Sequence, residues 1–240
     1  IWSAWAAYTS GANISTADLS GVEIRTRRMT TFCENSNYNT ISWNVEATPI
    51  AGTLAKTPNV LNVCENDIVS ATLTAGNGGN GTDELEFRTH NGTWSVWAAY
   101  TSGANISCWG LSSVEIRTRR SASTCEPSVY TVATWNVNPL PVPVINGSNS
   151  VCLNSTGHTY STAANMTNYS WAISAGGTIT AGANTSTITV NWNATGEQSV
   201  SVNYINENGC TAQNATIFEV TVNPLPLPSI NGRNFLCAGT

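Results

Sequence analysis

The sequence predicts an all-β chain of consecutive β-sandwich domains, arranged like beads on a string. Three observations predict this fold class. Segments recur at fixed spacings, apolar and polar residues alternate with a period of two, and no window carries a sustained period of 3.6 residues. Hydrophobic residues make up 41% of the 240 residues and nine residues are tryptophan, which is enough apolar surface for small cores.

The first repeat has a spacing of 92 residues, since segment 2–15 returns as 94–107 with a single difference. Segment 22–28 returns unchanged at the same spacing, as residues 114–120. A unit of about 90 residues is therefore repeated in series, as in array proteins.

A second repeat, with a spacing of 85 residues, lies further along the chain. The motif Asn-Pro-Leu-Pro at residues 138–141 recurs at 223–226. The two spacings divide the chain into four expected parts. These are the C-terminal part of a repeat at 1–47, a complete repeat at 48–138, a second type of domain at 139–223, and the start of another at 224–240. The chain is therefore expected to be a slice of a longer array.

The composition argues against several classes of protein. Only 10% of the residues are charged and the net charge is -5, so the chain has too few basic groups to bind nucleic acid. No apolar run approaches the roughly 20 residues that cross a bilayer, so this segment is not expected to span a membrane. Residues 138–232 contain no Lys or Arg. Such a hydroxyl-rich and amide-rich surface suits an extracellular stalk.

The cysteines recur with the repeats. Cys64 and Cys152 lie early in their repeats, whereas Cys125 and Cys210 lie late, each 13 residues before an Asn-Pro-Leu-Pro motif. The most economical pairing is one disulfide per repeat, which joins Cys64 to Cys125 and Cys152 to Cys210. Each bond would close a loop of roughly 60 residues and stabilise its repeat by about 4 kcal/mol through chain entropy. Disulfides in this pattern imply an oxidising compartment outside the cytoplasm.

Three further cysteines remain. Cys33 and Cys237 have their expected partners outside the sequence. Cys108 stands where the first copy has Thr16, and two roles are open for it. It is either a small buried apolar residue, which is the commoner role, or a thiol that bonds to a neighbouring chain. The molecular mass under non-reducing conditions distinguishes the two.

Alternation with a period of two predicts half-buried antiparallel strands. The clearest segments are residues 114–118, 133–137, 188–192, 200–204 and 218–222. Hairpin signals fall at residues 90–93, 175–177 and 207–209. The Pro-rich stretches 138–143 and 223–228 cannot lie in central strands, so we expect short, stiff linkers there.

The sequence from residue 139 onward resembles a known family. The resemblance is carried by Cys152 and the segments 169–171, 176–180, 188–192, 199–202, 208–210 and 220–224. In this order they resemble the PKD-like domains of giant surface proteins of Bacteroidetes, which include gliding-motility adhesins exported by the type IX secretion system. The resemblance covers residues 139–240.

The 92-residue repeats resemble bacterial immunoglobulin-like modules through segments 85–88, 91–94 and 114–117. The two resemblances imply tandem immunoglobulin-like (PKD-like) β-sandwiches, with the immunoglobulin-like type up to residue 138 and the PKD-like type after it. They also imply display on the bacterial outer surface and adhesion. The expected partners are a polysaccharide or protein of a cell surface or the environment, and other domains of the same long chain.

Aromatic and basic residues of the 92-residue repeat form the candidate binding site. They are Trp94, Trp97, Tyr100, Trp109, Arg117 and Arg119. One interpretation is a structural stack of guanidinium groups on indole rings, each contact worth about 0.5–2 kcal/mol. The other is a platform for sugar rings. We favour the stack, because on a regular strand Trp94 and Trp97 face opposite sides and the outward ring needs a cover.

No pattern in the sequence predicts catalysis, a cofactor or a metal site. The two histidines, His90 and His158, lie in different repeats, and no aspartates form the alternating loop that binds calcium. Glu84 and Glu86 share one face of a strand without an acid–base partner, so we expect a solvated edge there. The segment is therefore expected to be non-enzymatic.

Two functions are consistent with these observations. The first is the stalk of a long extracellular adhesin or surface filament, in which stapled sandwiches resist unfolding and Pro-rich linkers set the reach of a binding tip. The alternative is a carbohydrate-binding array, in which each 92-residue repeat presents its Trp and Tyr face.

Overall fold

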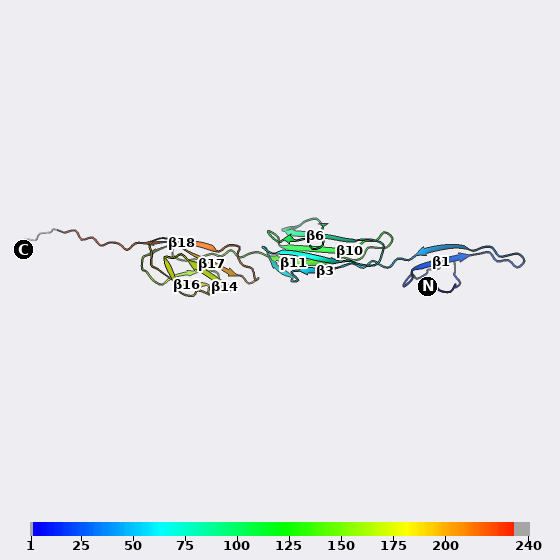
Figure 1. The fold of residues 1–240 in the computed structure, drawn as a ribbon, viewed down its shortest axis with the longest axis horizontal. Coiled ribbons are helices and arrows are strands. Elements are labelled where there is room, and N and C mark those ends of the chain that lie inside the picture. Colours follow the sequence, from blue (N-terminus) through cyan, green and yellow to red (C-terminus); the bar gives the residue numbers. More distant parts are fainter. Residues whose placement is uncertain (1, 233–240) are drawn as a thin grey trace, which may run out of the picture. The chain divides into compact units, whose positions relative to one another are not determined.

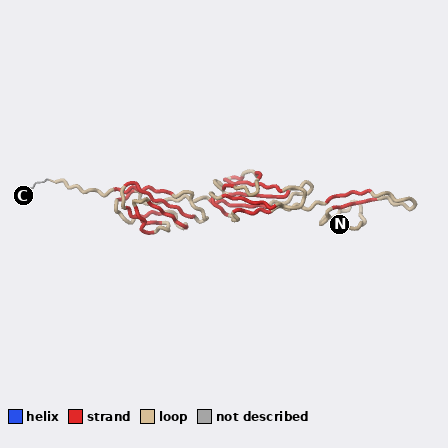
Figure 2. The backbone as a smooth tube through the Cα atoms, viewed as in Figure 1, coloured by secondary structure: helices blue, strands red, loops and turns tan. Residues whose placement is uncertain are grey.

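The structure, a computed structural model, describes residues 2–232 and is all-β, with no described residue in a helix (Figure 2). It forms tandem immunoglobulin-like β-sandwiches, which confirms the predicted fold class. The strands are β1 (Gly21–Thr26), β2 (Asn39–Asn44), β3 (Thr53–Thr57), β4 (Asn62–Cys64), β5 (Ile68–Thr74), β6 (Asp83–Asn91), β7 (Thr93–Trp94), β8 (Ala98–Ala99), β9 (Ile106–Ser107), β10 (Ser113–Arg120), β11 (Thr131–Asn138), β12 (Ser150–Cys152), β13 (His158–Ser161), β14 (Thr167–Ile173), β15 (Gly177–Ala181), β16 (Thr187–Trp192), β17 (Gly196–Ile205) and β18 (Thr216–Asn223).

The chain forms two compact units. The first comprises the residues up to Leu61 with Ile68–Ile106 and Ser113–Trp135, and the second comprises Asn62–Asp67, Ser107–Ser112 and the residues from Asn136 onward. Two short segments of the 48–138 repeat therefore belong to the second unit.

The 48–138 repeat contains two sheets. One has the order β4-β11-β10-β6-β7, with β8 also paired to β6, and the other has the order β3-β5-β9. Every second residue of β10 is buried, and Val114, Ile116 and Thr118 are fully inaccessible. The buried hydroxyl of Thr118 donates to the carbonyl oxygen of Glu84 at 2.9 Å, so its polar atom is satisfied. The fully buried Trp135 likewise donates to the Pro58 carbonyl at 3.0 Å.

Residues 2–47 contain the hairpin of β1 and β2, which repeats the β10–β11 pair at the 92-residue spacing. Trp43 of β2 is 49% exposed, whereas Trp135 at the same repeat position is fully buried. The described residues 2–47 form a single two-stranded sheet, whereas the repeat that contains Trp135 has two sheets. The assignment of 1–47 to the C-terminal part of a repeat stays a prediction.

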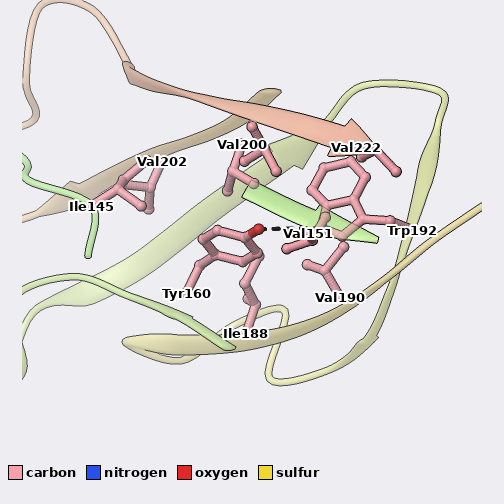
Figure 3. Packing of buried hydrophobic residues seen from close by; sticks show 10 residues of the cluster. Ile145, Val151, Tyr160, Ile188, Val190, Trp192, Val200, Val202 and Val222 are labelled. Atoms are coloured by element: carbon pink, nitrogen blue, oxygen red, sulfur yellow. Dashed lines mark hydrogen bonds between the residues drawn. The ribbon is translucent and has the colours of Figure 1, made fainter. Parts of the chain in front are cut away.

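The 139–223 region also contains two sheets, β12-β18-β17-β14 and β13-β16-β15. Figure 1 labels β14, β16, β17 and β18 of this region. The alternating apolar residues of the two sheets form one core, drawn in Figure 3, with Ile145, Val151, Tyr160, Ile188, Val190, Trp192, Val200, Val202, Val220 and Val222 as its buried members. At its centre the indole N–H of Trp192 donates to the Tyr160 hydroxyl at 3.1 Å, and that hydroxyl donates to the Ser148 carbonyl at 3.1 Å.

The strand and turn predictions are mostly confirmed. The signal at 90–93 is a hairpin between β6 and β7, with Gly92 at a φ of +74°. The signal at 207–209 lies between the paired strands β17 and β18. The hairpin expected at 175–177 is wrong, because β14 and β15 belong to different sheets and the turn crosses from one to the other.

The Pro-rich residues 139–144 and 224–232 lie outside the strands. A further PKD-like domain expected from 224 onward stays a prediction, since its cysteine, Cys237, falls outside the described residues.

Candidate functional site

The outward face of β6 and β10 carries three pairs of opposite charges. The antiparallel register places Glu115 opposite Arg88, Arg117 opposite Glu86, and Arg119 opposite Glu84. The shortest nitrogen–oxygen distances in these pairs are 2.6, 2.8 and 2.7 Å. All six side chains are only partly exposed. Directly opposed unlike charges stabilise a strand pair by roughly 0.2–1 kcal/mol each, so the three pairs fix the register more than they add stability.

Aromatic rings cover these guanidinium groups. Arg88 lies between Trp94 and Trp97, with its guanidinium carbon 4.2 and 4.5 Å from the ring centroids. Arg117 lies between Trp97 and Tyr130, at 3.8 and 4.0 Å. Trp97 thus contacts two guanidinium groups. Contacts at these distances are attractive because the ring quadrupole presents a negative face to the cation.

The last member of the stack is Arg119, whose guanidinium carbon lies 4.8 Å from the Tyr130 centroid. The hydrogen bond to Glu84 raises the pKa of the Arg119 guanidinium, against a smaller opposing effect of burial. We call this set the Arg–aromatic ladder, and its members are Arg88, Trp94, Trp97, Arg117, Arg119 and Tyr130.

The ladder recurs in the first repeat. Arg25 lies 3.7 Å from the Trp5 centroid and 4.2 Å from that of Tyr38, and Arg27 lies 4.7 Å from Tyr38. At the 92-residue spacing they correspond, in chain order, to Trp97, Arg117, Arg119 and Tyr130 of the ladder. They stack although segment 1–47 contains no counterpart of β6. The stack therefore forms within residues 2–47, whereas the ion pairs of the second copy require the charged residues of β6.

The structure brings four of the six predicted site residues into the ladder and places two elsewhere. Tyr100 is buried, and its hydroxyl accepts a hydrogen bond from the Ala71 amide and donates to the Ala104 carbonyl. It therefore belongs to the core. Trp109 lies in the turn after β9, outside the ladder, and is 57% exposed.

The expected arrangement of this region needs two corrections. Glu84 and Glu86 do not form a solvated edge, because β6 lies inside its sheet and both carboxylates pair with arginines of β10. Trp94 and Trp97 do not face opposite sides, because Trp94 ends β7 and Trp97 lies in the loop before β8. Both rings can therefore reach Arg88.

Sequence reasoning missed Arg88, Tyr130 and Glu115 as members of this site. A usable signal was present, since charges alternate at every second position along both β6 and β10. Two strands with complementary alternation are good candidates for antiparallel neighbours.

The predicted disulfide pairing is wrong. Cys64 is bonded to Cys210, with a Cα–Cα distance of 5.6 Å, and both residues lie in the second compact unit. Cys125 and Cys152 carry free thiols. The bond therefore joins the end of β4 to the connection between β17 and β18, and neither of the two expected bonds is formed.

Strand length explains the error. Cys64 lies opposite Asn138, the last residue of β11, whereas Cys125 precedes the first residue of β11. Eight residues of strand span roughly 25 Å, far beyond the 4.4–6.8 Å between Cα atoms that a disulfide allows. The same holds for Cys152 and Cys210, which lie at opposite ends of β18.

Cys108 is fully buried, as the commoner of its two roles requires. Burial raises the pKa of its thiol to about 11, and the negative charge of Asp67 adds to the effect. A protonated, inaccessible thiol is a poor nucleophile, so Cys108 behaves as a small apolar residue.

A Ser–His contact lies at the start of the 139–223 domain, where Ser155 Oγ is 2.7 Å from His158 Nε2. The Ser155 hydroxyl donates to the Cys152 carbonyl, so His158 has to donate to Ser155 instead of accepting its proton. This is the reverse of the arrangement that activates a nucleophile. Across residues 2–232, no three His, Cys, Asp or Glu side chains come together in a group that could hold a metal ion.

Residues 138–220 match the PKD-like domain family, which is less than half of the chain. No curated protein matches the sequence. Nothing within residues 2–232 is a helix of the length and apolarity that a membrane crossing requires.

Solved structures with some likeness to the chain share little sequence with it. An adhesin of an Antarctic bacterium that binds ice is 12% identical, with a TM-score of 0.38, over 87% of this chain and 58% of the adhesin. The fibronectin(III)-like modules of Clostridium thermocellum CbhA are 11% identical, with a TM-score of 0.33, over 76% of this chain and 100% of the modules. The Yersinia pseudotuberculosis adhesin InvE is 18% identical, with a TM-score of 0.25, over 72% of this chain and 58% of InvE. At these values the likeness carries no information about function.

Proposed function

We propose that this chain is a non-catalytic segment of a long extracellular adhesin or surface filament, and that it acts as a disulfide-stapled stalk for a binding tip. The observation that carries the proposal is the Cys64–Cys210 bond, which closes a sequence separation of 146 residues. A bond of this kind persists in an oxidising compartment and limits how far the chain can be drawn out.

The strand arrangement supports a mechanical role. In each domain an early strand runs parallel to the last one, as β4 does to β11 and β12 does to β18. When the disulfide is reduced and the chain is stretched from both ends, a parallel pair of this kind is pulled in opposite directions along its length. The hydrogen bonds between the two strands are then loaded together, and the domain resists extension.

We propose 48–138 and 139–223 as the two complete domains of the stalk, preceded by part of a domain at 1–47 and followed by the start of another at 224–240. The Pro-rich stretches between domains act as short, stiff linkers.

Single-molecule pulling between the two ends tests the stalk role. The oxidised chain should extend less than the reduced chain by about 500 Å, since 146 residues at about 3.4 Å each stay closed behind the disulfide. A Cys64→Ser chain is the matched control and should extend equally in both conditions. A reduced chain whose domains give no force peaks above the noise would contradict a mechanical stalk.

We extend the proposal to location. The disulfide, the lack of Lys and Arg in residues 138–232 and the PKD-like match at 138–220 support display outside the cell. The resemblance to gliding-motility adhesins suggests export by the type IX secretion system. Antibody labelling of unpermeabilised cells should stain the surface, and the staining should disappear in a strain without that system.

A carbohydrate-binding array is the second candidate, and the observation that favours it is the exposed ring of Trp109. Its counterpart in the first repeat is Ala17, however, so the exposed indole is not itself repeated. The ring of Trp97 is already in contact with two arginines. Binding of the chain to a glycan array that is lost in Trp109→Ala, with unchanged stability, would favour this candidate over a pure stalk.

A further inference from the structure

We call a cysteine early when it ends the strand that pairs in parallel with the last strand of its domain, and late when it lies in the connection before that last strand. Two early cysteines occupy equivalent positions in successive domains. Cys64 ends β4 opposite Asn138, and Cys152 ends β12 opposite Asn223. In both cases the amide of the next residue donates to that asparagine carbonyl, at 3.0 and 2.8 Å. Cys64 and Cys152 are therefore equivalent in strand pairing, in register and in the turn after the strand.

Two late cysteines are equivalent in the same way. Cys125 lies in the connection between β10 and β11, and Cys210 lies in the connection between β17 and β18. Each is 13 residues before the last residue of its domain's final strand. Cys33 lies between β1 and β2 and corresponds to Cys125 at the 92-residue spacing.

The one disulfide of the described chain joins an early cysteine to the late cysteine of the following domain. Cys152 is an early cysteine and is exposed, and Cys125 is a late cysteine and is partly exposed. Both are free in this chain, which holds no late cysteine after Cys210 and no early cysteine before Cys64 among residues 2–232. Cys108 is neither early nor late, and it is buried.

We propose that the Cys64–Cys210 pairing is a rule of the array and that Cys152 and Cys125 are its next two sites. Cys152 forms a disulfide with the late cysteine of a PKD-like domain that comes after it. Cys125 forms one with the early cysteine of a domain that precedes it. The ligand at each site is thus a cysteine thiol at a defined position of a neighbouring domain.

The chemistry needs a disulfide oxidant, for which oxidised glutathione serves. The thiolate of Cys152 attacks one glutathione sulfur, forms a mixed disulfide and expels one glutathione thiolate. The late thiolate of the next domain then attacks the Cys152 sulfur and expels the second. Two protein thiols are oxidised to one disulfide, two glutathione molecules are released, and each takes up one of the protons.

The inference deepens the proposed stalk and rests on its premise that the domains continue in series. Under this rule consecutive domains are joined both by the peptide linker and by a disulfide. Mapping the bonds tests the pairing and pulling tests the mechanical role, so either proposal can fail without the other.

The test uses a chain in which residues 139–223 are repeated once directly after Asn223, so that the natural Asn-Pro-Leu-Pro junction is kept. The added copy carries Cys152→Ser, so that it brings no second early thiol, and Thr211→Ser, so that the peptide of its late cysteine differs in mass from that of the original copy. The chain is oxidised with glutathione, blocked with iodoacetamide, digested without reduction and analysed by mass spectrometry. The expected result is a cross-linked peptide between Cys152 and the added copy's late cysteine, alongside the Cys64–Cys210 peptide.

Matched variants assign the bonds. Cys152→Ser should abolish the new cross-link and leave Cys64–Cys210 intact, and Cys64→Ser should do the reverse. Alkylated Cys152 in a chain that keeps the Cys64–Cys210 peptide would overturn the proposal, and so would a cross-link from Cys152 to any other cysteine. Loss of the Cys64–Cys210 peptide in the unmutated chain would overturn the rule itself.

Discussion

The guanidinium carbon of Arg117 lies 3.8 Å from the centre of the Trp97 ring, on the outward face of a sheet. The same ring also contacts Arg88 at 4.5 Å. An indole held between two cations, each paired with a carboxylate, is an arrangement that stabilises the sheet and leaves little free ring surface for a ligand. Substitutions in and around the ladder distinguish these two uses of the ring.

Replacing Trp97 with Ala should lower the stability of the 48–138 repeat. Two cation–π contacts of about 0.5–1 kcal/mol each are lost, so we expect about 1–2 kcal/mol and a fall in Tm of several degrees. Thermal unfolding followed by circular dichroism measures the change. Trp109→Ala is the control and should change the stability by less than about 0.5 kcal/mol. Equal effects of the two substitutions would argue against the ladder.

Replacing Arg117 with Lys should destabilise the repeat although the charge is kept. The planar guanidinium stacks on Trp97 and Tyr130 while it bonds to Glu86, and an ammonium group cannot do both. We expect a loss of about 1 kcal/mol, measured by urea unfolding. Arg28→Lys, outside the ladder, is the control and should be close to neutral. An Arg117→Lys chain as stable as the unmutated one would show that charge alone matters here.

Replacing Tyr160 with Phe should destabilise the 139–223 domain. The Tyr160 hydroxyl accepts from the buried indole N–H of Trp192, and without it that donor is left unsatisfied at a cost of about 1–3 kcal/mol. Urea unfolding of the variant gives the value. Tyr169→Phe removes a more exposed hydroxyl, which donates to the Ala163 carbonyl, and should cost less. The reverse order would contradict the buried network.

Stability should fall between about pH 9 and 11 because of Cys108. Burial raises the pKa of its thiol from 9.0 to about 11, so the unfolded chain releases this proton at lower pH than the folded chain does. The contribution is fully present below pH 9 and is lost as the pH rises through the folded value. Urea unfolding at pH 8 and pH 10.5 should show a smaller decline for Cys108→Ala than for the unmutated chain. Equal declines would show that the thiol titrates normally.

Much of the fold could be predicted from the sequence, because apolar residues on the inward face of a half-buried strand alternate with polar residues on its outward face. Val190 and Trp192 alternate with polar residues, and both are fully buried. The four-part division, by contrast, rests on repeats in the sequence and stays a proposal, since the compact units do not coincide with it.

The disulfide could not be predicted in the same way. Equal sequence spacings made Cys125 look like the partner of Cys64, but spacing does not say at which end of a strand each cysteine lies. The ladder was only half predictable for a related reason. Trp97 lies in the loop between β7 and β8, where the alternation of a strand does not apply. A period of two therefore assigns its side chain to the wrong face.

The parallel pairing of an early strand with the last strand has an evolutionary consequence. A domain whose chain enters at one end and leaves at the other can be duplicated or deleted as a whole without reversing the direction of the domains after it. The near-identity of segments 2–15 and 94–107 fits a recent copying event of this kind. A gene built in this way can change the length of its product by unequal recombination, one domain at a time, while each new copy brings its own pair of cysteines.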